Sequence, residues 1–116
     1  MLFITPEDFF EKVKAISPLD RETELALAQR MQAGDPDARE ALIRGYLPHV
    51  AAVIRRRNRL QTLEGILRCY IALEQAVDRF DFLQEHDTFS HYLSWVMRQT
   101  ATRYLADVYT RDVSTP

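Results

Sequence analysis

The sequence has few of the features that stabilise a small protein covalently or break it into loops. Its 116 residues contain 1 cysteine and 3 glycines, so Cys69 has no partner for an internal disulfide. No apolar run approaches the roughly 20 residues needed to cross a membrane. The N-terminus "MLFITPEDFF" lacks the basic segment and apolar run of a secretion signal. We therefore expect a cytoplasmic protein of one domain, residues 1–116, whose fold depends on a buried core.

The chain also lacks a large excess of positive charge, because its 15 basic and 17 acidic residues leave a net charge of −2. Binding of nucleic acid by bulk electrostatics requires Lys and Arg to displace counterions from phosphates, so any such contact must be local. Thirteen of the basic residues are arginine, and four lie in "RRRNR" at 55–59. This cluster fits phosphate binding by guanidinium groups, or more simply a solvated helix end favoured by the helix dipole.

Patterns that carry catalysis or metal binding are missing as well. The three histidines are too scattered to form a zinc site with Cys69, which lies on an apolar stripe between Ile66 and Leu73. There is no glycine-rich phosphate loop and no nucleophile elbow. We expect neither an enzyme nor a cofactor, a metal ion or a small-molecule substrate.

Helical periodicity and clear helix starts are what the sequence does contain. Thr5, Asp20, Asp35 and Thr62 each precede an amphipathic stretch as an N-cap residue would. The pattern predicts an all-α bundle of five or six helices, at about 6–16, 20–33, 36–57 with a break near Pro48, 62–81 and 90–109. The last two helices are expected to pack antiparallel. Residues 1–18 are interpreted as an N-terminal helical extension and residues 110–116 as a flexible tail.

The last predicted helix carries two stripes. One has the spacing of a core seam and consists of Leu93, Val96, Met97, Ala101, Tyr104 and Val108. The other combines two aromatic rings with an amide, a hydroxyl and a guanidinium: Tyr92, Trp95, Gln99, Thr102 and Arg103. We also expect Ser90 to cap this helix. A mixed second face of this kind is typical of a binding surface.

Three blocks, in order along the chain, resemble domain two of the bacterial sigma-70 family of RNA polymerase sigma factors, with the helix pair that precedes it. They are "LDRETELALAQRMQAGDPDAREALIRGYLPHV", "ALEQAVDRFD" and "TFSHYLSWVMRQTATRYLAD". The resemblance covers residues 19–107. It implies one helix that docks on a coiled coil of the largest polymerase subunit, and a second that melts the promoter minus-ten element and receives a flipped base in an aromatic pocket. The implied DNA-binding residues are Tyr92, Trp95, Gln99, Thr102, Arg103 and Arg98. The implied polymerase-binding or partner-binding residues are Glu64, Leu67, Arg68, Tyr70 and Glu74.

The chain also departs from this family pattern. Val96 stands where the family has a second tryptophan, and the loop "FLQEHDT" is acidic where the family loop is basic. Leu67, Arg68 and Tyr70 replace Gln, Glu and Asn on the docking helix. We also expect the chain to be truncated, because it ends before the family's helix-turn-helix domain. Acidic groups near phosphates weaken binding, so promoter contact is expected to be weak or to depend on a partner.

Three hypotheses follow. The first is a sigma-like transcription protein at RNA polymerase, acting as the polymerase-binding half of a split sigma factor or as a reduced, regulatory one. Its partner is the polymerase core or a second sigma-like protein. The second is a protein-interaction module that does not bind DNA, a decoy or antagonist of a sigma-related partner. The third is a helical remnant without activity. On the docking helix, Leu67 and Tyr70 either contact a partner or pack inside the protein.

Overall fold

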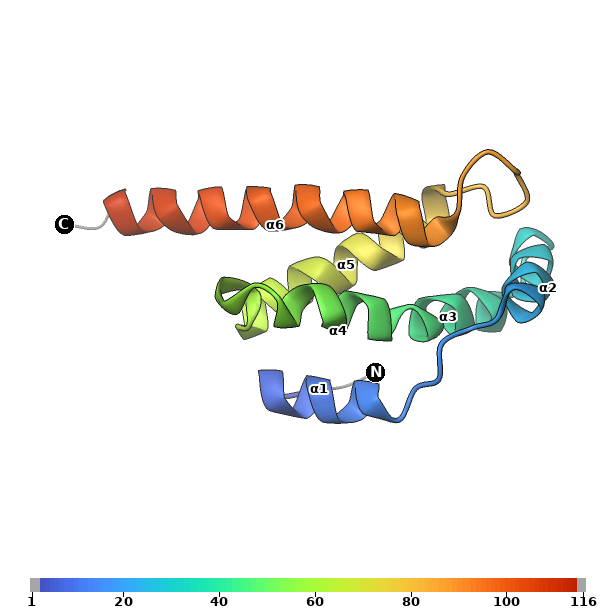
Figure 1. The fold of residues 1–116 in the computed structure, drawn as a ribbon, viewed down its shortest axis with the longest axis horizontal. Coiled ribbons are helices and arrows are strands. Elements are labelled where there is room, and N and C mark those ends of the chain that lie inside the picture. Colours follow the sequence, from blue (N-terminus) through green and yellow to red (C-terminus); the bar gives the residue numbers. More distant parts are fainter. Residues whose placement is uncertain (1–2, 115–116) are drawn as a thin grey trace.

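The computed structural model describes residues 3–114, and this part of the chain is built from α-helices and one 3-10 turn (Figure 1). No β-strand occurs within these residues, so the predicted all-α class is confirmed. The elements are α1 (Pro6–Lys14), α2 (Arg21–Gln32), α3 (Pro36–Gly45), α4 (Leu47–Arg55), η1 (Asn58–Leu60), α5 (Leu63–Arg79) and α6 (Phe89–Ser114). Within the same residues, no helix has both the length and the apolar character of a membrane span.

The predicted caps begin four of the helices. The side chain of Thr5 accepts a hydrogen bond from the Asp8 N–H, and that of Asp35 accepts one from the Asp37 N–H. Asp20 Oδ1 accepts from the Thr23 N–H at 2.7 Å, and Thr62 Oγ1 accepts from the Gly65 N–H at 3.0 Å. Each bond satisfies a backbone donor that the first helical turn leaves unpaired. The starts of these helices therefore follow from local sequence.

The break predicted near Pro48 falls at Tyr46, between α3 and α4. Pro48 lies in the first turn of α4, where its missing N–H costs no helical hydrogen bond. Gly45 is buried at this junction, and a Cβ added there would lie 2.4 Å from Leu19 Cγ. The segment that leads into α2 therefore crosses the junction in close contact with it.

Helices α5 and α6 run antiparallel, as predicted, and form the most extensive contact in the bundle (Figure 1). Thr62 at the start of α5 hydrogen bonds to the Tyr104 hydroxyl at 2.8 Å. At the other end of the pair, the Phe80 ring stacks on Tyr92. The core lies between these two helices, α3 and α4, and Phe9 of α1 is buried against it. Its fully buried large side chains include Leu47, Ile54, Ile66, Leu73, Leu93 and Met97.

Helix α6 continues beyond its predicted end near residue 109. Arg111 Nη2 donates to Glu64 Oε2 at 3.1 Å, and Arg68 Nη1 donates to Asp107 Oδ2 at 2.6 Å. These bonds tie the last turns of α6 to α5. Residues 110–114 of the predicted tail are thus helical, whereas residues 115 and 116 lie outside the described part of the chain.

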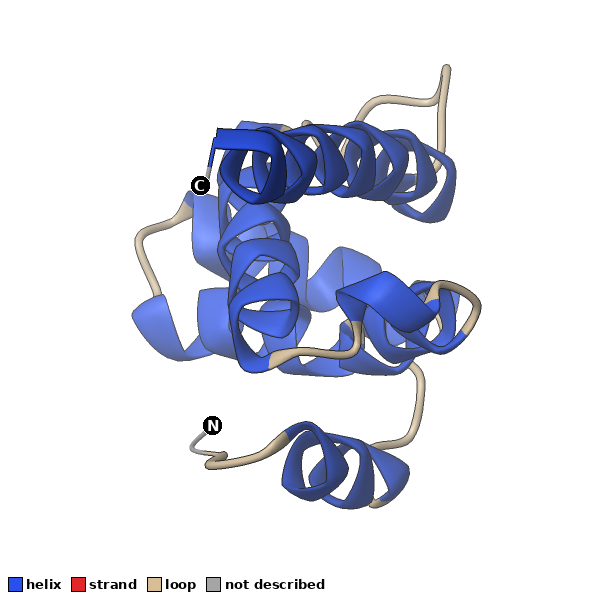
Figure 2. Cartoon of the chain, turned by 90° about the vertical axis from the view of Figure 1, so that its left-hand side faces the viewer, coloured by secondary structure: helices blue, strands red, loops and turns tan. Residues whose placement is uncertain are grey.

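Helix α2 buries Glu24, Leu27 and Ala28. Helix α2 contacts mainly α3, whereas α1 packs against α4 and is joined to α2 by a loop (Figure 2). Because α2 has one main neighbour, its buried face is narrow, and Leu25 and Met31 are only half-buried.

Candidate functional site

Three aromatic rings stack where α5 ends and α6 begins. Phe80 and Tyr92 have ring centroids 5.2 Å apart at an interplanar angle of 28°, and Tyr92 and Trp95 follow at 6.4 Å and 25°. Burial decreases along the stack, since Phe80 and Tyr92 are half-buried and Trp95 is 51% exposed. The outer Trp95 ring therefore presents a flat surface to solvent, supported from within. Such a surface is suited to stacking against another ring, including an unpaired base.

A groove of about 390 Å³ lies beside this stack, between α5 and α6. Val96 forms part of its wall with a smaller side chain than the tryptophan that the resemblance predicts there. Polar groups from both helices line much of the rest, and the lining residues include Ile71, Gln75 and Arg79 of α5 with Trp95, Gln99 and Arg103 of α6. The groove thus offers a ring face together with amide and guanidinium donors.

The six residues predicted to bind DNA do not all lie at this groove. The structure brings Tyr92, Trp95, Gln99 and Arg103 together there. Thr102 is exposed on α6 next to them but does not line the groove. Arg98 lines a different cavity, between α6 and α4. The second stripe of α6 is therefore a continuous face with the groove along one side.

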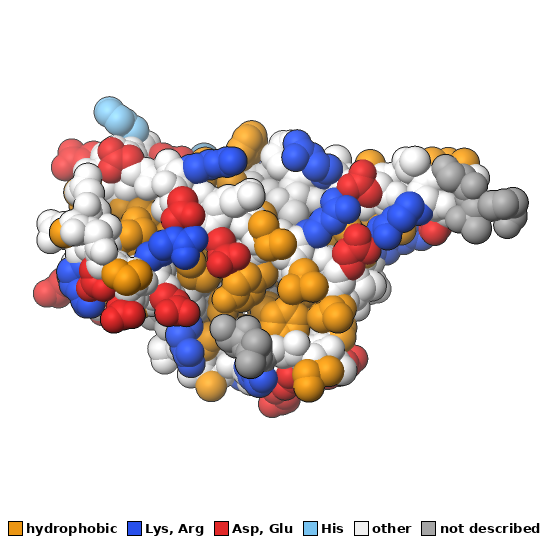
Figure 3. Space-filling model, turned by 180° about the vertical axis from the view of Figure 1, so that it is seen from behind, with side chains coloured by type: hydrophobic (Ala, Val, Ile, Leu, Met, Phe, Trp, Pro, Cys, Tyr) orange, Lys and Arg blue, Asp and Glu red, His pale blue; other side chains and the backbone are white. Residues whose placement is uncertain are grey.

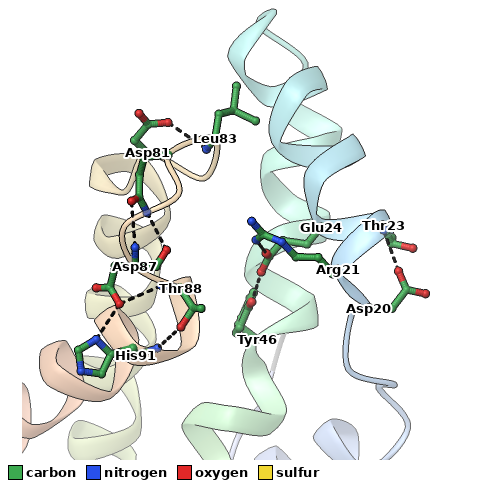
Figure 4. Close-up of polar contacts among 11 residues, drawn as sticks. Asp20, Arg21, Thr23, Glu24, Tyr46, Asp81, Leu83, Asp87, Thr88 and His91 are labelled. Atoms are coloured by element: carbon green, nitrogen blue, oxygen red, sulfur yellow. Dashed lines mark hydrogen bonds and ion pairs between the residues drawn. The ribbon is translucent and has the colours of Figure 1, made fainter.

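The acidic loop that precedes α6 is held by its own hydrogen bonds (Figure 4). Gln84 Oε1 accepts from the backbone N–H groups of His86 and Asp87, and Gln84 Nε2 donates to the Asp87 carbonyl. Asp87 Oδ1 lies 2.7 Å from His91 Nδ1. His91, in the first turn of α6, thus contacts one of the loop acids.

Helix α6 is capped by Thr88 rather than by Ser90, which corrects the expectation from sequence. It begins at Phe89, and Thr88 Oγ1 accepts from the His91 N–H at 3.1 Å. Ser90 lies inside the helix, where its carbonyl accepts from the Ser94 hydroxyl at 2.9 Å. Either residue satisfies the capping preference, and the conformation of the loop selects Thr88.

The residues predicted to bind polymerase or a partner lie on two edges of α5. Arg68 faces α6, where it bonds to Asp107 and its guanidinium lies 5.3 Å from the centre of the Tyr104 ring. Tyr70 is half-buried on the other edge, and its pKa is raised by burial and by the negative charges of Glu74 and Glu40. Because Arg68 and Tyr70 are two positions apart, their side chains point about 160° from each other around the helix. Arg68 and Tyr70 therefore lie at opposite edges of the exposed face of α5.

Apolar side chains occupy the exposed face between these two edges. Leu67 and Leu63 are each 43% exposed and Ile71 is 51% exposed, at four-residue steps along α5. Figure 3, which views the molecule from behind, shows hydrophobic side chains gathered over this region. Glu64 is exposed on the same helix and is bonded to Arg111. Leu67 is thus available at the surface, as a contact with a partner requires.

Two parts of the site were missed at the level of sequence. Ile71, Gln75 and Arg79 form the α5 side of the groove, and their four-residue spacing along α5 was the available signal. The second is a buried polar cluster in which Glu24 accepts from Arg21 Nη1 at 2.6 Å and from the Tyr46 hydroxyl (Figure 4). Burial and Glu24 both raise the pKa of Tyr46. This cluster holds α2 against the junction of α3 and α4.

Comparison with known proteins gives sigma factors as relatives, although no family model matches the chain. The RNA polymerase sigma factor SigA of Listeria monocytogenes is 32% identical over 101 residues, which cover 85% of this chain and 27% of that protein. SigA of Clostridium acetobutylicum is 37% identical over 98 residues, which cover 83% of this chain and 25% of that protein. These matches support a relationship with sigma factors of the sigma-70 type. The chain spans about a quarter of the length of these curated relatives.

Proposed function

We propose that this chain is a sigma-factor-like transcription protein that acts at RNA polymerase in the cytoplasm and has no catalytic activity of its own. The similarity to proteins named RNA polymerase sigma factor, over most of this chain, supports the general role. The observation that carries the DNA-binding part is the exposed Trp95 ring, stacked on Tyr92 beside a groove with polar groups.

Promoter contact would be made by an unpaired base of the minus-ten element that stacks on Trp95. Stacking of a base on an aromatic ring contributes about 1–3 kcal/mol in proteins that bind single strands. Gln99 and Arg103 line the same groove and can donate hydrogen bonds to a base edge or a phosphate. Because Val96 leaves one wall small and the preceding loop is acidic, we expect the isolated chain to bind only in the range of roughly 10⁻⁴–10⁻⁶ M.

The remaining affinity would come from a protein partner, either the polymerase core or a second sigma-like chain of a split sigma factor. The exposed face of α5 is the surface we assign to it, with Leu67 at its centre and Glu64, Arg68, Tyr70 and Glu74 around it. Arg68 is already bonded to Asp107, so a partner gains little from its charge. Leu67 is expected to contribute more.

A second candidate function is a protein-interaction module that binds a sigma-related partner without contacting DNA. The observation that favours it is the apolar row of Leu63, Leu67 and Ile71 on the surface of α5. Surface residues of this kind in a continuous row are typical of a protein-protein interface. The two candidates differ in whether Trp95 contacts a base.

Fluorescence anisotropy with a labelled single-stranded minus-ten oligonucleotide tests the first function. Loss of stacking in Trp95→Ala is expected to weaken binding about 5- to 150-fold. A double variant, Glu85→Lys plus Asp87→Lys, is expected to bind the oligonucleotide more tightly, because it removes the repulsion between the loop acids and the phosphates. Tyr109→Ala is the matched control, since Tyr109 is an exposed aromatic residue of α6 that lies outside the groove.

Unchanged binding in both the Trp95 and the loop variants, with helical circular dichroism retained, would contradict the DNA-binding role. The interaction module would then be the better account. A pull-down comparing the wild type with Leu67→Glu would test it, because a charge in the centre of the apolar row should abolish capture of the partner.

A further inference from the structure

A second cavity, of about 660 Å³, lies between α4 and α6 and has a different chemistry from the aromatic groove. Side chains from two separate parts of the chain converge on it. His49, Arg56 and Arg57 come from α4 and the turn that follows, and Ser94 and Arg98 come from α6. No carboxylate is among the described residues that line it.

The arginines of this cavity carry charge that the rest of the described chain does not neutralise. Arg56, Arg57 and Arg98 are exposed, and none of the three forms an ion pair with a described carboxylate. The sequence shows why, because residues 41–63 contain no Asp or Glu, and neither do residues 88–106. Packing of α4 against α6 brings these two acid-free stretches together. The local field is therefore positive although the net charge of the chain is −2.

The fold directs the arginines of the "RRRNR" cluster to different surroundings, so the cluster is more than a solvated helix end. The Arg55 guanidinium lies over the Phe10 ring at 4.8 Å and is directed toward α1. Arg59 belongs to η1 and does not line the cavity. Arg56 and Arg57 instead meet Arg98 of a distant helix. The helix dipole accounts for arginines at the end of α4, but it gives no reason for a third arginine from α6 at the same cavity.

The remaining lining consists of the polar side chains of His49 and Ser94 and the apolar side chains of Ala52 and Val53. His49 Nε2 lies 3.1 Å from Ser94 Oγ, so the two side chains hold each other in place across the interface between α4 and α6. Three guanidinium groups around such a lining match the oxygens of a phosphate, which accept several charge-assisted hydrogen bonds at once. A carboxylate ligand offers fewer oxygens in one place.

We propose that this cavity binds a backbone phosphate of the nucleic-acid strand whose base stacks on Trp95. Arg98 and Trp95 are three residues apart on α6, which places their side chains about 60° from each other around the helix. One strand can therefore present a base to the groove and a neighbouring phosphate to the cavity. The identity of the strand rests on the proposed function, whereas the preference for phosphate rests on the cavity itself.

Salt dependence of binding tests the proposal on the full chain. For a single strand, log K falls with log salt by about 0.7 for each phosphate that the protein neutralises. Anisotropy titrations at several salt concentrations would compare the wild type with Arg56→Gln plus Arg57→Gln and with Arg98→Gln. Each arginine that contacts phosphate should lower the slope by about 0.7 when it is removed. Arg44→Gln is the control, because Arg44 is exposed and belongs to α3, away from the cavity.

Two competitors at constant ionic strength separate the sources of phosphate. An abasic single strand, which has phosphodiesters but no bases, should displace the labelled oligonucleotide from Trp95→Ala as well as from the wild type. Inorganic phosphate should displace it far less. Equal displacement by inorganic phosphate would identify a free-anion site and overturn the assignment to a strand.

Failure of this inference can be told apart from failure of the proposed function. If Trp95→Ala weakens binding but all the arginine variants keep the wild-type slope, the cavity does not hold phosphate and the base-stacking role stands. If the wild type binds no single strand at any salt concentration, the proposed function fails and the strand assigned to the cavity fails with it.

Discussion

Glu24 is a charged side chain that folding removes almost entirely from water, with 5% of its surface exposed. Its carboxylate accepts hydrogen bonds from Arg21 and from the Tyr46 hydroxyl. A buried charge is tolerated only when its partners compensate for lost hydration, and removal of one partner leaves the charge under-satisfied. The junction of α2, α3 and α4 therefore depends on two polar residues as well as on its apolar contacts.

The first prediction concerns this cluster. Tyr46→Phe keeps the ring and removes the hydroxyl, so Glu24 loses one hydrogen bond, and we expect the free energy of unfolding to fall by about 1–3 kcal/mol. Urea denaturation followed by circular dichroism measures the change. Tyr109→Phe, at an exposed tyrosine, should alter stability by less than about 0.5 kcal/mol. Equal stability of the two variants would show that Glu24 does not need the hydroxyl.

A second residue-scale prediction concerns Cys69, whose thiol is buried. Burial raises the pKa of this thiol from 9.0 to about 11. The folded chain keeps the thiol neutral at pH values where the unfolded chain ionises it. This contribution to stability is complete below pH 9.0 and is lost as the pH rises through about 11. Denaturation of the wild type and Cys69→Ala at about pH 8 and about pH 10 should show a smaller loss of stability in the variant. The same loss in both would contradict the prediction.

At the scale of the elements, the sequence predicted the features that depend on neighbouring residues, which are the helix starts. Thr5, Asp20, Asp35 and Thr62 act within one helical turn, so their caps could be recognised from neighbouring residues. The groove between α5 and α6 could not be, because it depends on which edge of α5 meets α6. The same packing places Arg68 on the edge of α5 that faces α6 and Tyr70 on the opposite edge. The choice of Thr88 over Ser90 likewise depends on the path of a loop that carries no periodic pattern.

Gly65 provides a prediction at this scale, since it is buried in the first turn of α5. A Cβ at this position would lie 2.5 Å from the Leu60 carbonyl oxygen, which belongs to the backbone of η1 and cannot rotate away. Gly65→Ala should therefore lower the free energy of unfolding by about 1–3 kcal/mol, although alanine is the better helix former. Thermal or urea denaturation would measure it.

Gln75→Ala is the matched control for Gly65→Ala, because Gln75 is an exposed residue of the same helix. Its stability should change by less than about 0.5 kcal/mol. A Gly65→Ala variant as stable as this control would mean that η1 can move away from α5 at little cost.

For the whole molecule, the arrangement of charge matters more than its sum. Carboxylates are absent from 41–63 and from 88–106, and this pattern is visible in the sequence alone. What the sequence could not supply is the packing of these two stretches against each other. The cavity that contains Arg56, Arg57 and Arg98 exists only because α4 and α6 meet.

The far end of α6 supplies a prediction about the molecule as a whole. Glu64, Arg68, Asp107 and Arg111 alternate in charge across α5 and α6 and fasten the part of α6 that extends beyond the bundle (Figure 1). These groups are substantially exposed, so the network should contribute little to global stability. Its effect should be local.

Asp107→Asn is therefore expected to speed amide hydrogen exchange in residues 107–114 without a measurable change in the urea midpoint. Glu85→Gln, which changes the charge of a loop acid distant from this network, should leave exchange there unaltered. Unchanged exchange in the Asp107 variant would mean that helix packing alone holds the end of α6.

Trp95 gives the molecule an intrinsic optical signal at its proposed binding surface. The chain contains 1 tryptophan, and that residue lies half-exposed on the surface proposed to receive a base. Indole emission therefore comes from a single place, next to Tyr92 and the groove. A base that stacks on the indole should quench this emission, while occupation of the arginine cavity alone should not. Base stacking on Trp95 and phosphate binding in the arginine cavity can thus be distinguished by fluorescence of the unlabelled, unmodified chain.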